Sequence, residues 1–460
     1  MSSANRMSPT ELRASLSLAS IFGLRMLGMF VILPVFAIYS EHLKGGDNLT
    51  LVGVALGAYG LTQAILQIPF GWLSDRYGRK PVIYFGLAIF ALGSFVAASA
   101  DDIYVVILGR VLQGAGAISA AVIAMVADLT REEQRTKAMA MIGSTIGLTF
   151  AVSLVASPWL NHLIGVPGIF AMTGVLSILA MGVVYAVIPD VPEDVVPAAV
   201  RADKSAPGFF AVLWDPQLAR LNFGILALHA VLMAMFIVVP LSLREAGLAV
   251  GEHWRIYLPV MLGSFVLMVP AILLAERRGR VKFIFVGAVG LLLAGQLTMP
   301  WLLGGVGPIS AFLLMFFTAF NVLEAMLPSL TSKLAPPGAK GTAIGVYSSV
   351  QFLGTFIGAA CGGFLYQHFG PRGVFVFDAV LLLAWVVLAA GMRAPVRMQT
   401  RAYTIPALDT AQAGSLLARL RAQPGVREVQ LATAERTAYL KVDAKGYDER
   451  VVLRLIEDLT

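Results

Sequence analysis

The sequence is poor in charged residues. Asp, Glu, Lys and Arg make up 13% of its 460 residues, and hydrophobic residues make up 58%. In an ordinary soluble domain about a quarter of the residues are charged. So few charges cannot cover the surface of a soluble protein of this length, and the composition therefore excludes a soluble fold.

Cysteine and the familiar catalytic motifs are also lacking. The single cysteine, Cys361, lies inside an apolar stretch, so neither an internal disulfide nor a thiolate metal cluster can form within the chain. The sequence contains no H-E-x-x-H zinc motif, no nucleophile elbow, no facing pair of Asp motifs and no P-loop. We therefore expect no enzyme activity, no metal, no cofactor and no use of ATP.

Long apolar stretches are abundant instead. A hydrocarbon layer of about 30 Å is crossed by about 20 apolar residues in a helix, and we count twelve stretches of this kind: roughly 14–39, 50–73, 82–100, 103–126, 138–160, 166–189, 221–243, 256–275, 283–303, 307–332, 341–366 and 373–392. They predict an all-α polytopic membrane protein with twelve transmembrane helices. The first stretch lacks a small-residue cleavage site, so we expect it to stay as an anchor.

The positive charges predict an orientation. If the N-terminus lies inside, the inner segments up to residue 401 hold about twenty Lys and Arg, and the outer loops hold four: Lys44, Arg244, Arg255 and Arg372. Lys and Arg accumulate on the cytoplasmic side of membrane proteins, so we expect both termini in the cytoplasm. The net charge of +7 reflects this topology and does not indicate binding of nucleic acid.

A polar linker and two echoes indicate an internal repeat. Residues 190–218 are rich in proline and charge, and they divide the apolar stretches into six and six. DRYGRK at 75–80 is echoed by ERRGRV at 276–281, and DLT at 128–130 by SLT at 329–331, both with an offset of 201 residues. We expect two six-helix halves, 1–189 and 219–393, related by an axis along the membrane normal.

The composition becomes ordinary after the last apolar stretch. In residues 398–460 we expect a strand at 403–407, a helix at 409–423, a hairpin of 426–433 with 437–443, and a helix at 448–459. This order predicts a small α+β, ferredoxin-like domain on the cytoplasmic side. PGVREVQL and AYLKVD resemble heavy-metal-associated modules, but the paired cysteines of those modules are missing. Binding of a small ligand and self-association both stay open for this domain.

A short turn concentrates charge between two uncharged stretches. Residues 71–81, GWLSDRYGRKP, hold four charged side chains. Gly78 permits a bend with positive φ, and Gly71 lets its helix approach a neighbour closely. Asp75 is placed to cap the N–H groups at the N-terminus of a facing helix. Topology alone would require the positive charges but none of these three residues, so we interpret the turn as a conformational latch.

The turn also resembles a family signature. Gly71-x-Leu73-x-Asp75-Arg76-x-Gly78-Arg79-Lys80 matches, in residue type and spacing, the motif between helices two and three of major facilitator transporters. Arg110-x-x-Gln113-Gly114-x-Gly116 resembles the second signature of their proton-coupled drug-efflux branch. GLRMLGMFVILPV, DLTREEQRTKAMA, HWRIYL and GTAIGVYSSVQFLG resemble bacterial inner-membrane members of that branch.

This resemblance implies a function. It implies a secondary transporter of the bacterial inner membrane that expels a small solute in exchange for protons, with the proton gradient as its energy source. The antiporter signature on helix five contains a Gly-Pro pair where this chain has Ser157-Pro158, so the expectation of antiport depends on the other motifs.

The resemblance also implies how the latch works. Asp75 would cap the helix that begins near Gly341-Thr342, and Arg79 would pair with Asp128. These contacts would tie the halves together on the cytoplasmic face in the outward-open state and break when that face opens. The expected latch residues are Gly71, Asp75, Arg76, Gly78, Arg79, Lys80 and Asp128.

Few ionisable residues lie inside the apolar stretches, where a charge costs about 2.5–3.5 kcal/mol at the membrane centre. Glu324 is the only carboxylate deep in the second half, so it is our first candidate for the proton carrier, with Asn321 one turn before it. An ion pair inside the bundle is the alternative. The resemblance places Arg110, with Gln113 on the same face, near the proton path; a structural hydrogen-bonding role is the alternative.

Three further ionisable residues have open roles. Arg25 is expected either to bind an anionic group or to lock helix packing. His229 is expected either to titrate near neutral pH or to donate a hydrogen bond between helices. Asp378 lies near the outer third of its stretch, where we expect it to reach water.

Polar side chains also recur at every fourth residue on three stretches, so that each set lies on one helix face. The sets are Tyr59, Gln63 and Gln67; Thr145, Thr149 and Ser153; and Tyr347, Gln351 and Thr355. They are expected either to line a central cavity or to join helices. A cavity with so few charges favours amphipathic or hydrophobic solutes over sugars and phosphates. The alternative function is a transporter-like sensor that signals through residues 398–460 and moves no net solute.

Overall fold

The computed structural model describes residues 7–190, 209–336, 339–392, 398–406, 410–432, 436–443 and 446–457. The chain divides into two compact units, Met1–Met392 and Arg393–Thr460, and each is described by itself. Most of the linker predicted at 190–218 lies outside the described residues.

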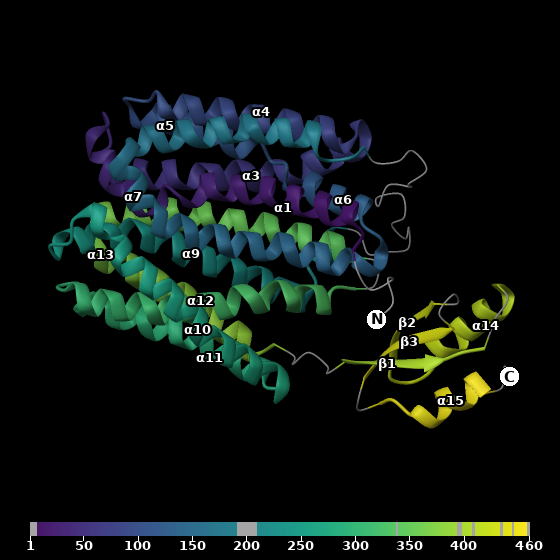
Figure 1. The fold of residues 1–460 in the computed structure, drawn as a ribbon. Helices are drawn as coiled ribbons and strands as arrows, with labels where there is room; N and C mark the ends of the chain where they lie inside the picture. Colours follow the sequence, from purple (N-terminus) through teal and green to yellow (C-terminus); the bar gives the residue numbers. More distant parts are fainter. Residues whose placement is uncertain are drawn as a thin grey trace. The chain divides into compact units, whose positions relative to one another are not determined.

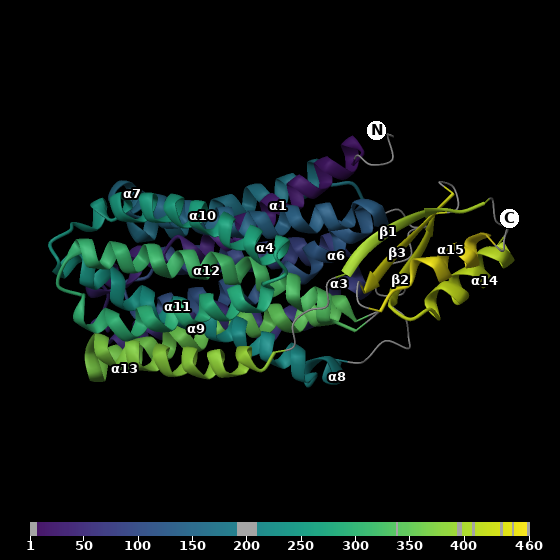
Figure 2. The ribbon, with the colours of Figure 1, turned by 90° about the horizontal axis from the view of Figure 1, so that it is seen from below.

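The first unit is a bundle of helices that run side by side along one direction (Figure 1, Figure 2). Its α-helices are α1 (Pro9–Phe30), α2 (Leu33–Tyr39), α3 (Leu49–Tyr77), α4 (Arg79–Ala98), α5 (Ile103–Ala115), α6 (Ser119–Leu129), α7 (Glu132–Ala186), α8 (Phe209–Leu213), α9 (Pro216–Glu245), α10 (Trp254–Arg277), α11 (Val281–Thr298), α12 (Val306–Leu334) and α13 (Lys340–Ala390). Short 3₁₀ helices follow at Ser40–His42, Val250–Glu252 and Met299–Trp301. We call α1 to α7 the first half and α9 to α13 the second half.

Ten helical segments of the described residues are long and apolar enough to cross a membrane, whereas the sequence predicted twelve helices. The difference comes from α7 and α13, which have 55 and 51 residues. At about 1.5 Å per residue, each would be more than twice as long as a hydrocarbon layer of about 30 Å is thick. Each is interrupted by one glycine with positive φ, Gly165 (67°) in α7 and Gly370 (65°) in α13. Two predicted stretches therefore meet at each glycine without an intervening loop.

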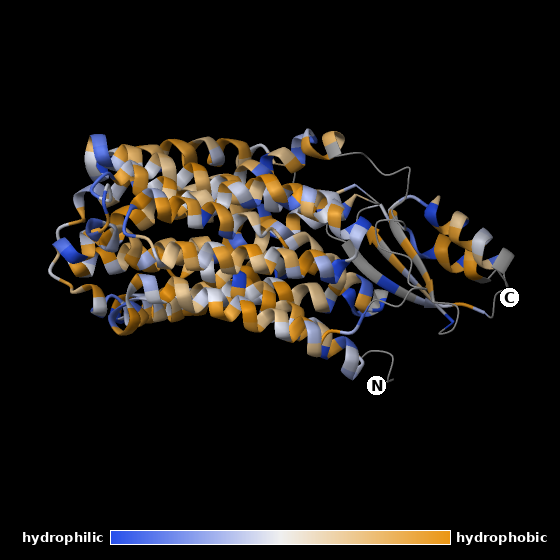
Figure 3. Cartoon of the chain, turned by 90° about the horizontal axis from the view of Figure 1, so that it is seen from above, coloured by the Kyte–Doolittle hydropathy of each residue, from blue (hydrophilic) through white to orange (hydrophobic). Residues whose placement is uncertain are grey.

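The outer surface of the bundle is apolar. Large hydrophobic side chains such as Phe85, Val266 and Val380 have more than half of their surface exposed. Hydrophilic residues gather at the two ends of the helices (Figure 3). Monomeric soluble proteins rarely expose so continuous an apolar surface, so the surface indicates contact with lipid.

Each end of the bundle is named here after one residue. The Asp75 end holds residues 75–80 and 128–131, and the Glu41 end holds residues 41–48 and 244–253. The two halves touch mainly through α3 and α13, which run antiparallel. A Cβ on Gly53 would stand 2.1 Å from the carbonyl oxygen of Ala359, so only glycine lets the two helices approach this closely.

The second unit has the predicted order of elements within its described residues. These are β1 (Met398–Thr404), α14 (Thr410–Arg421), β2 (Val426–Ala432), β3 (Thr437–Asp443) and α15 (Glu449–Glu457). The sheet order is β1-β3-β2, and β3 is antiparallel to both neighbours. Leu416 and Leu420 of α14 and Val452 of α15 are wholly buried against the sheet.

The boundaries of the second unit differ in part from the prediction. The first strand lies at 398–404 and not at 403–407, because its pairing with β3 begins at Met398 and Asp443 and ends before Pro406, which has no N–H group to donate. Leu459, which we expected to face the core, lies outside the described residues, as do residues 407–409, 433 and 458 at the predicted ends of the elements.

Candidate functional site

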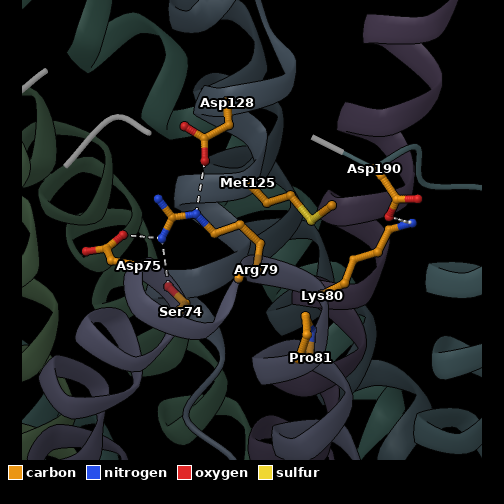
Figure 4. Close-up of a pocket in the computed structure, with 9 residues that line it drawn as sticks. Ser74, Asp75, Arg79, Lys80, Pro81, Met125, Asp128 and Asp190 are labelled. Carbon is orange, nitrogen blue, oxygen red and sulfur yellow. Dashed lines mark hydrogen bonds and ion pairs between the residues drawn. The ribbon is translucent and has the colours of Figure 1, made fainter. Parts of the chain in front are cut away.

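The charged turn folds around Arg79. Its guanidinium donates from Nε to Asp128 Oδ2 at 2.9 Å and from Nη1 to Ser74 Oγ at 2.8 Å, and it forms an ion pair with Asp75 (Figure 4). Gly78, with a φ of 93°, separates the end of α3 from the start of α4 and lets the chain reverse. The pairing of Arg79 with Asp128, which we expected, joins α4 to the end of α6.

The other residues of the turn have separate partners. Lys80 pairs with Asp190 at 2.7 Å, just beyond the end of α7. Arg76 is exposed, and its guanidinium lies over two aromatic rings of its own helix. A Cβ on Gly71 would lie 3.4 Å from the Cβ of Ala120, so α3 packs closely on α6 there. A cavity of about 250 Å³ lies beside the turn (Figure 4), lined by Ser74, Asp75, Gly78, Arg79, Lys80, Pro81, Met125, Asp128 and Asp190.

The expected cap between Asp75 and α13 is not formed in this structure. α13 begins at Lys340, and none of the described side chains caps its N-terminus. A Cβ on Gly341 or Gly345 would meet nothing within 4 Å, so α13 is not packed against α3 at this end. The two helices, which contact each other at Gly53, Gly57 and Gly60, make no such glycine contact near the start of α13.

The register of α3 and α13 nevertheless places Asp75 and the N-terminus of α13 at the same level along the bundle. A Cβ on Gly53 would contact Gly363, one on Gly57 would contact Phe356, and one on Gly60 would contact the carbonyl of Phe352. The two residue numbers in each of these pairs add up to between 412 and 416. Since the helices are antiparallel, the same register puts Asp75 level with the start of α13 at Lys340.

The Glu41 end is closed by contacts that the sequence analysis missed. Arg244, at the end of α9, donates two hydrogen bonds to the carboxylate of Glu41, at 2.8 and 2.7 Å. Gln367 Oε1 accepts from the backbone N–H of Leu49, the first residue of α3, at 2.7 Å. Both contacts join one half to the other. Their partners lie about 200 and 320 residues apart in the chain, and no local pattern marks them.

Arg110 is wholly buried and is held by uncharged groups. Its Nη1 donates to the carbonyl of Gly28 at 3.1 Å and to Gln113 Oε1 at 2.8 Å, and its guanidinium lies 5.0 Å from the ring centroid of Tyr59. Gln113 in turn donates to Ser94 at 2.8 Å. Arg110 and Gln113 therefore act on each other, as their spacing predicted, inside the first half.

Arg25 is the second buried cation of the first half. Its Nη2 donates to the hydroxyl of Tyr59 at 3.0 Å and to Gln63 Oε1 at 2.7 Å. Gln63 also donates to Gln67 and to Ser119. Tyr59, Gln63 and Gln67 are buried, so of the two roles left open for this set, the structure shows hydrogen bonding between helices.

Glu324, Gln351 and His229 meet in the second half. The Nε2 amide of Gln351 lies 2.8 Å from His229 Nε2 and 3.3 Å from Glu324 Oε1. His229 Nδ1 lies 3.3 Å from the carbonyl of Ile225. A tautomer with its proton on Nδ1 satisfies the whole arrangement, because Nδ1 then donates to Ile225 and Nε2 accepts from Gln351. The other carboxylate oxygen of Glu324, Oε2, is buried and has no hydrogen-bond partner among the described residues.

This cluster lies next to the contact between the halves. The ring of Phe320 on α12 lies 5.9 Å from His229 and 5.8 Å from Phe150 on α7, measured between ring centroids. Only the side chain of Phe320 therefore lies between His229 of this cluster and Phe150 of the first half. Tyr347, one turn from Gln351 on α13, is buried, and its hydroxyl has no partner in the part of the chain that the structure describes.

Three predicted residues lie apart from the cluster. Asn321 donates its side-chain hydrogen bond to Ser264 of α10, at 2.9 Å, and not to Glu324. Thr355 bonds to the carbonyl of Phe352 in its own helix. Asp378 does not reach water, contrary to our expectation: its exposure is 0% and both carboxylate oxygens are unpaired among the described residues, because α11 and α12 cover that face of α13.

A further ion pair at the Asp75 end was missed. Glu11 receives hydrogen bonds from the backbone N–H, Nε and Nη2 of Arg131, at 2.9, 2.9 and 3.0 Å. The same carboxylate completes a capping box with Ser8 at the start of α1. The pattern S-x-x-E before an apolar run would have revealed the cap, although not the pairing with Arg131.

Comparison with known proteins decides the family. The model of the Major Facilitator Superfamily matches residues 18–359 and 254–424, and that of the YajR YAM domain matches residues 404–454. The chain belongs to the major facilitator superfamily. It is a membrane transport protein and not an enzyme, as the superfamily and the similar proteins agree.

Individual members of the superfamily are similar over most of the chain. The inner membrane transport protein YajR of Escherichia coli (strain K12) is 44% identical over 440 residues, which are 96% of each chain. An uncharacterised transporter of Buchnera aphidicola subsp. Baizongia pistaciae is 34% identical, over 82% of this chain and 95% of the relative. The multidrug resistance protein MdtH of Aeromonas hydrophila is 26% identical, over 75% and 85%.

Solved structures show the same fold. A bacterial homologue of the human lysosomal transporter Spinster, in an inward-facing and occupied conformation, matches with a TM-score of 0.69 at 15% identity, over 84% of this chain and 98% of the other. The human organic anion transporter MFSD10 matches with a TM-score of 0.62 at 19% identity, over 83% of this chain and 100% of the other.

Proposed function

We propose that this protein is a proton-driven exporter of small amphipathic or hydrophobic solutes in a bacterial inner membrane. The names of two relatives support the membrane and the class of cargo: one is an inner membrane transport protein and another a multidrug resistance protein. The mostly uncharged, aromatic contact between the halves suits a solute of low polarity better than a sugar or a phosphate.

The chain crosses the membrane twelve times in this proposal. The breaks at Gly165 and Gly370 divide α7 and α13 into two crossings each, which raises the ten candidate segments to twelve. The excess of Lys and Arg at the Asp75 end supports a cytoplasmic position for that end, and the Glu41 end then faces the periplasm. In this proposal the first half, 1–189, and the second half, 219–393, move relative to each other.

Alternating access rests on one observation, the relation between α3 and α13. The helices touch at Gly53, Gly57 and Gly60 and are apart at the Asp75 end, although their register puts Asp75 level with the start of α13. A rocking motion about the glycine contact would close the Asp75 end and let Asp75 cap α13, where the helix dipole favours an anion. The structure then corresponds to the inward-facing state, with the latch open.

The contacts at the Glu41 end complete this cycle. The pair of Glu41 with Arg244 and the bond from Leu49 to Gln367 hold the periplasmic side closed while the cytoplasmic side is open. The two ends work alike in this proposal. Gln367, just before the break at Gly370 in α13, accepts from the N-terminus of α3, and Asp75, near the end of α3, would accept from the N-terminus of α13. Only one end can be closed at a time if the helices pivot between them.

Protons enter this mechanism at Glu324. Gln351 donates to one of its oxygens, and the other oxygen has no hydrogen-bond partner among the described residues, so a proton on Oε2 completes the carboxyl group without displacing any of them. Gln351 also bonds His229, and the cluster contacts Phe320 at the boundary between the halves. Loss of the proton would leave a negative charge on Glu324 beside that boundary. This charge would change the relative populations of the inward-facing and outward-open states.

The second unit is proposed to be a ferredoxin-like regulatory domain in the cytoplasm. Its order βαββα and its sheet order β1-β3-β2 are those of a split βαβ unit. Either binding of a small ligand or self-association would give it a regulatory role, and neither requires a metal.

Transport by the purified protein in liposomes is the test. A pH gradient across the vesicle wall should drive movement of amphipathic dyes such as ethidium and rhodamine 6G, and collapse of the gradient with an ionophore should stop it. Dye movement that ignores the gradient would overturn proton coupling. Ligand-dependent changes in conformation with no net movement of any dye would favour the sensor over the exporter.

A further inference from the structure

The first half of the bundle carries an imbalance of charge. Its six apolar stretches contain Arg25 and Arg110 and no Asp or Glu. Both arginines are buried, with exposures of 1% and 0%. A buried cation is strongly unfavourable unless an anion or a full set of acceptors offsets it, so two such cations without a carboxylate call for a counter-charge.

The hydrogen bonds of the two arginines do not supply it. Arg25 uses only Nη2, which bonds Tyr59 and Gln63, while its Nε and Nη1 are buried and unpaired among the described residues. These two atoms carry three of the five N–H groups of a guanidinium. The Nε of Arg110 is buried and unpaired as well. The existing partners are carbonyl, amide and hydroxyl oxygens, which carry no net charge.

The two cations approach the same side chain. The guanidinium carbon of Arg25 lies 5.8 Å from the ring centroid of Tyr59, and that of Arg110 lies 5.0 Å from it. Arg25 also lies 5.7 Å from the ring of Phe90. Ring faces attract cations, but two like charges around one ring repel each other. A small anion beside the unpaired N–H groups would accept their hydrogen bonds and would also reduce the repulsion between the two guanidinium groups.

We propose that the first half binds one small inorganic anion, of the size of chloride, at Arg25 and Arg110. A carboxylate of a transported solute has the same recognition chemistry. Burial favours the inorganic ion, because neither guanidinium is open to a solute in this state. The site is separate from Glu324, which lies in the other half, and the proposal does not depend on which solute is exported.

The experiment compares the thermal unfolding of the full chain in detergent in sodium chloride and in sodium gluconate, at equal ionic strength and pH. Gluconate is too large for an enclosed site, so the wild-type protein should unfold several degrees higher in chloride, with a saturable dependence on its concentration. Bromide should replace chloride. A mixture of organic carboxylates that stabilises the protein while chloride does not would assign the site to the solute and overturn the inorganic ion.

Arg25→Met is the informative variant, because it removes the charge and keeps an unbranched apolar side chain of comparable length. It should lose the difference between chloride and gluconate. Arg220→Met, which removes a partly exposed hydrogen-bonding arginine of the second half, is the matched control and should keep that difference. If Arg25→Met does not fold, the wild-type comparison decides alone: equal unfolding temperatures in chloride and gluconate overturn the proposal.

Discussion

Two carboxyl groups of the second half have different surroundings, and this difference separates their roles. Glu324 has a donor on one oxygen, a histidine within reach and the boundary between the halves one side chain away. Asp378 has no partner among the described residues and is covered by helices of its own half. A group that carries protons must exchange them with water and change the contact between the halves. Glu324 is partly exposed, so it can exchange protons with water, and it lies close to the contact between the halves. Asp378 meets neither condition.

Glu324→Gln is predicted to abolish movement driven by the pH gradient. Gln has nearly the same volume and mimics only the uncharged carboxyl, so the bundle should fold and dye should still bind. The fall in the initial rate should be at least about a hundredfold, the usual size of an effect when a proton-transfer group is lost. The assay is dye uptake into inverted vesicles, with equilibrium binding measured in parallel. Gradient dependence equal to that of the wild type would eliminate Glu324 as the carrier.

Asp378→Asn is the matched control and should leave transport intact. An isolated charge at this place is unfavourable, and Asn removes the possibility of charge while nearly conserving shape. We expect wild-type rates within about twofold and thermal stability that is equal or higher. A loss of gradient-driven transport in this variant, with binding retained, would assign proton carriage to Asp378.

Helices α3 and α13 form the element on which the mechanism depends. Three glycines let them touch near the Glu41 end, and each helix carries an acceptor that is level with the N-terminus of the other. In this structure one of these caps is formed, from Gln367 to Leu49, and Asp75 instead pairs with Arg79. The ion pair of Arg79 with Asp128 and its hydrogen bond to Ser74 hold the end of α3 against α4 and α6 while Asp75 does not cap α13.

Asp75→Asn should weaken the closed state of the Asp75 end. The variant retains an acceptor but loses the charge that favours a helix N-terminus, a contribution of about 1 kcal/mol, so the outward-open state should become about fivefold less populated. Transport should fall while membrane insertion is unchanged, because Arg76, Arg79 and Lys80 remain.

Accessibility of a cysteine placed at Tyr77, in a background without Cys361, measures the population of the open Asp75 end. Asp47→Asn, an exposed aspartate at the other end, is the control and should have no effect. Full transport together with unchanged accessibility in Asp75→Asn would remove the latch from the mechanism.

At the scale of the whole molecule, the sequence predicted the parts that local patterns determine. Apolar stretches marked the helices, and the signature around Asp75 led to the ion pair of Arg79 with Asp128. Contacts between distant segments were missed, since neither Glu41 with Arg244 nor Leu49 with Gln367 has a local signal. The joining of stretches at Gly165 and Gly370 was missed as well, because a single glycine with positive φ replaces the loop that a pattern search expects. The burial of Asp378 depends on neighbours from two other helices and could not be inferred from its depth alone.

Removal of residues 398–460 should leave the helical bundle folded. The second unit has its own core, in which Leu416, Leu440 and Val452 are wholly buried, and the boundary between the two compact units falls between Met392 and Arg393. We expect the truncated chain to elute as a single species in detergent with an unfolding temperature within a few degrees of the full chain, while regulation or self-association changes. Aggregation of all truncated protein would show that the bundle needs the second unit.

The central claim is that the two ends of the bundle open in turn, and distances measured across both ends of one protein in lipid test it most directly. Spin labels at Asp47 and Arg255 report on the Glu41 end, and labels at Tyr77 and Lys333 report on the Asp75 end, in a chain with Cys361 replaced by Ala. Glu41→Arg places two cations together, which should lengthen the first distance and shorten the second, with a change of at least about tenfold in the ratio of the two states. The exchange Glu41→Arg with Arg244→Glu should restore both distributions. Distances that stay fixed at both ends, or that lengthen together, would contradict the account.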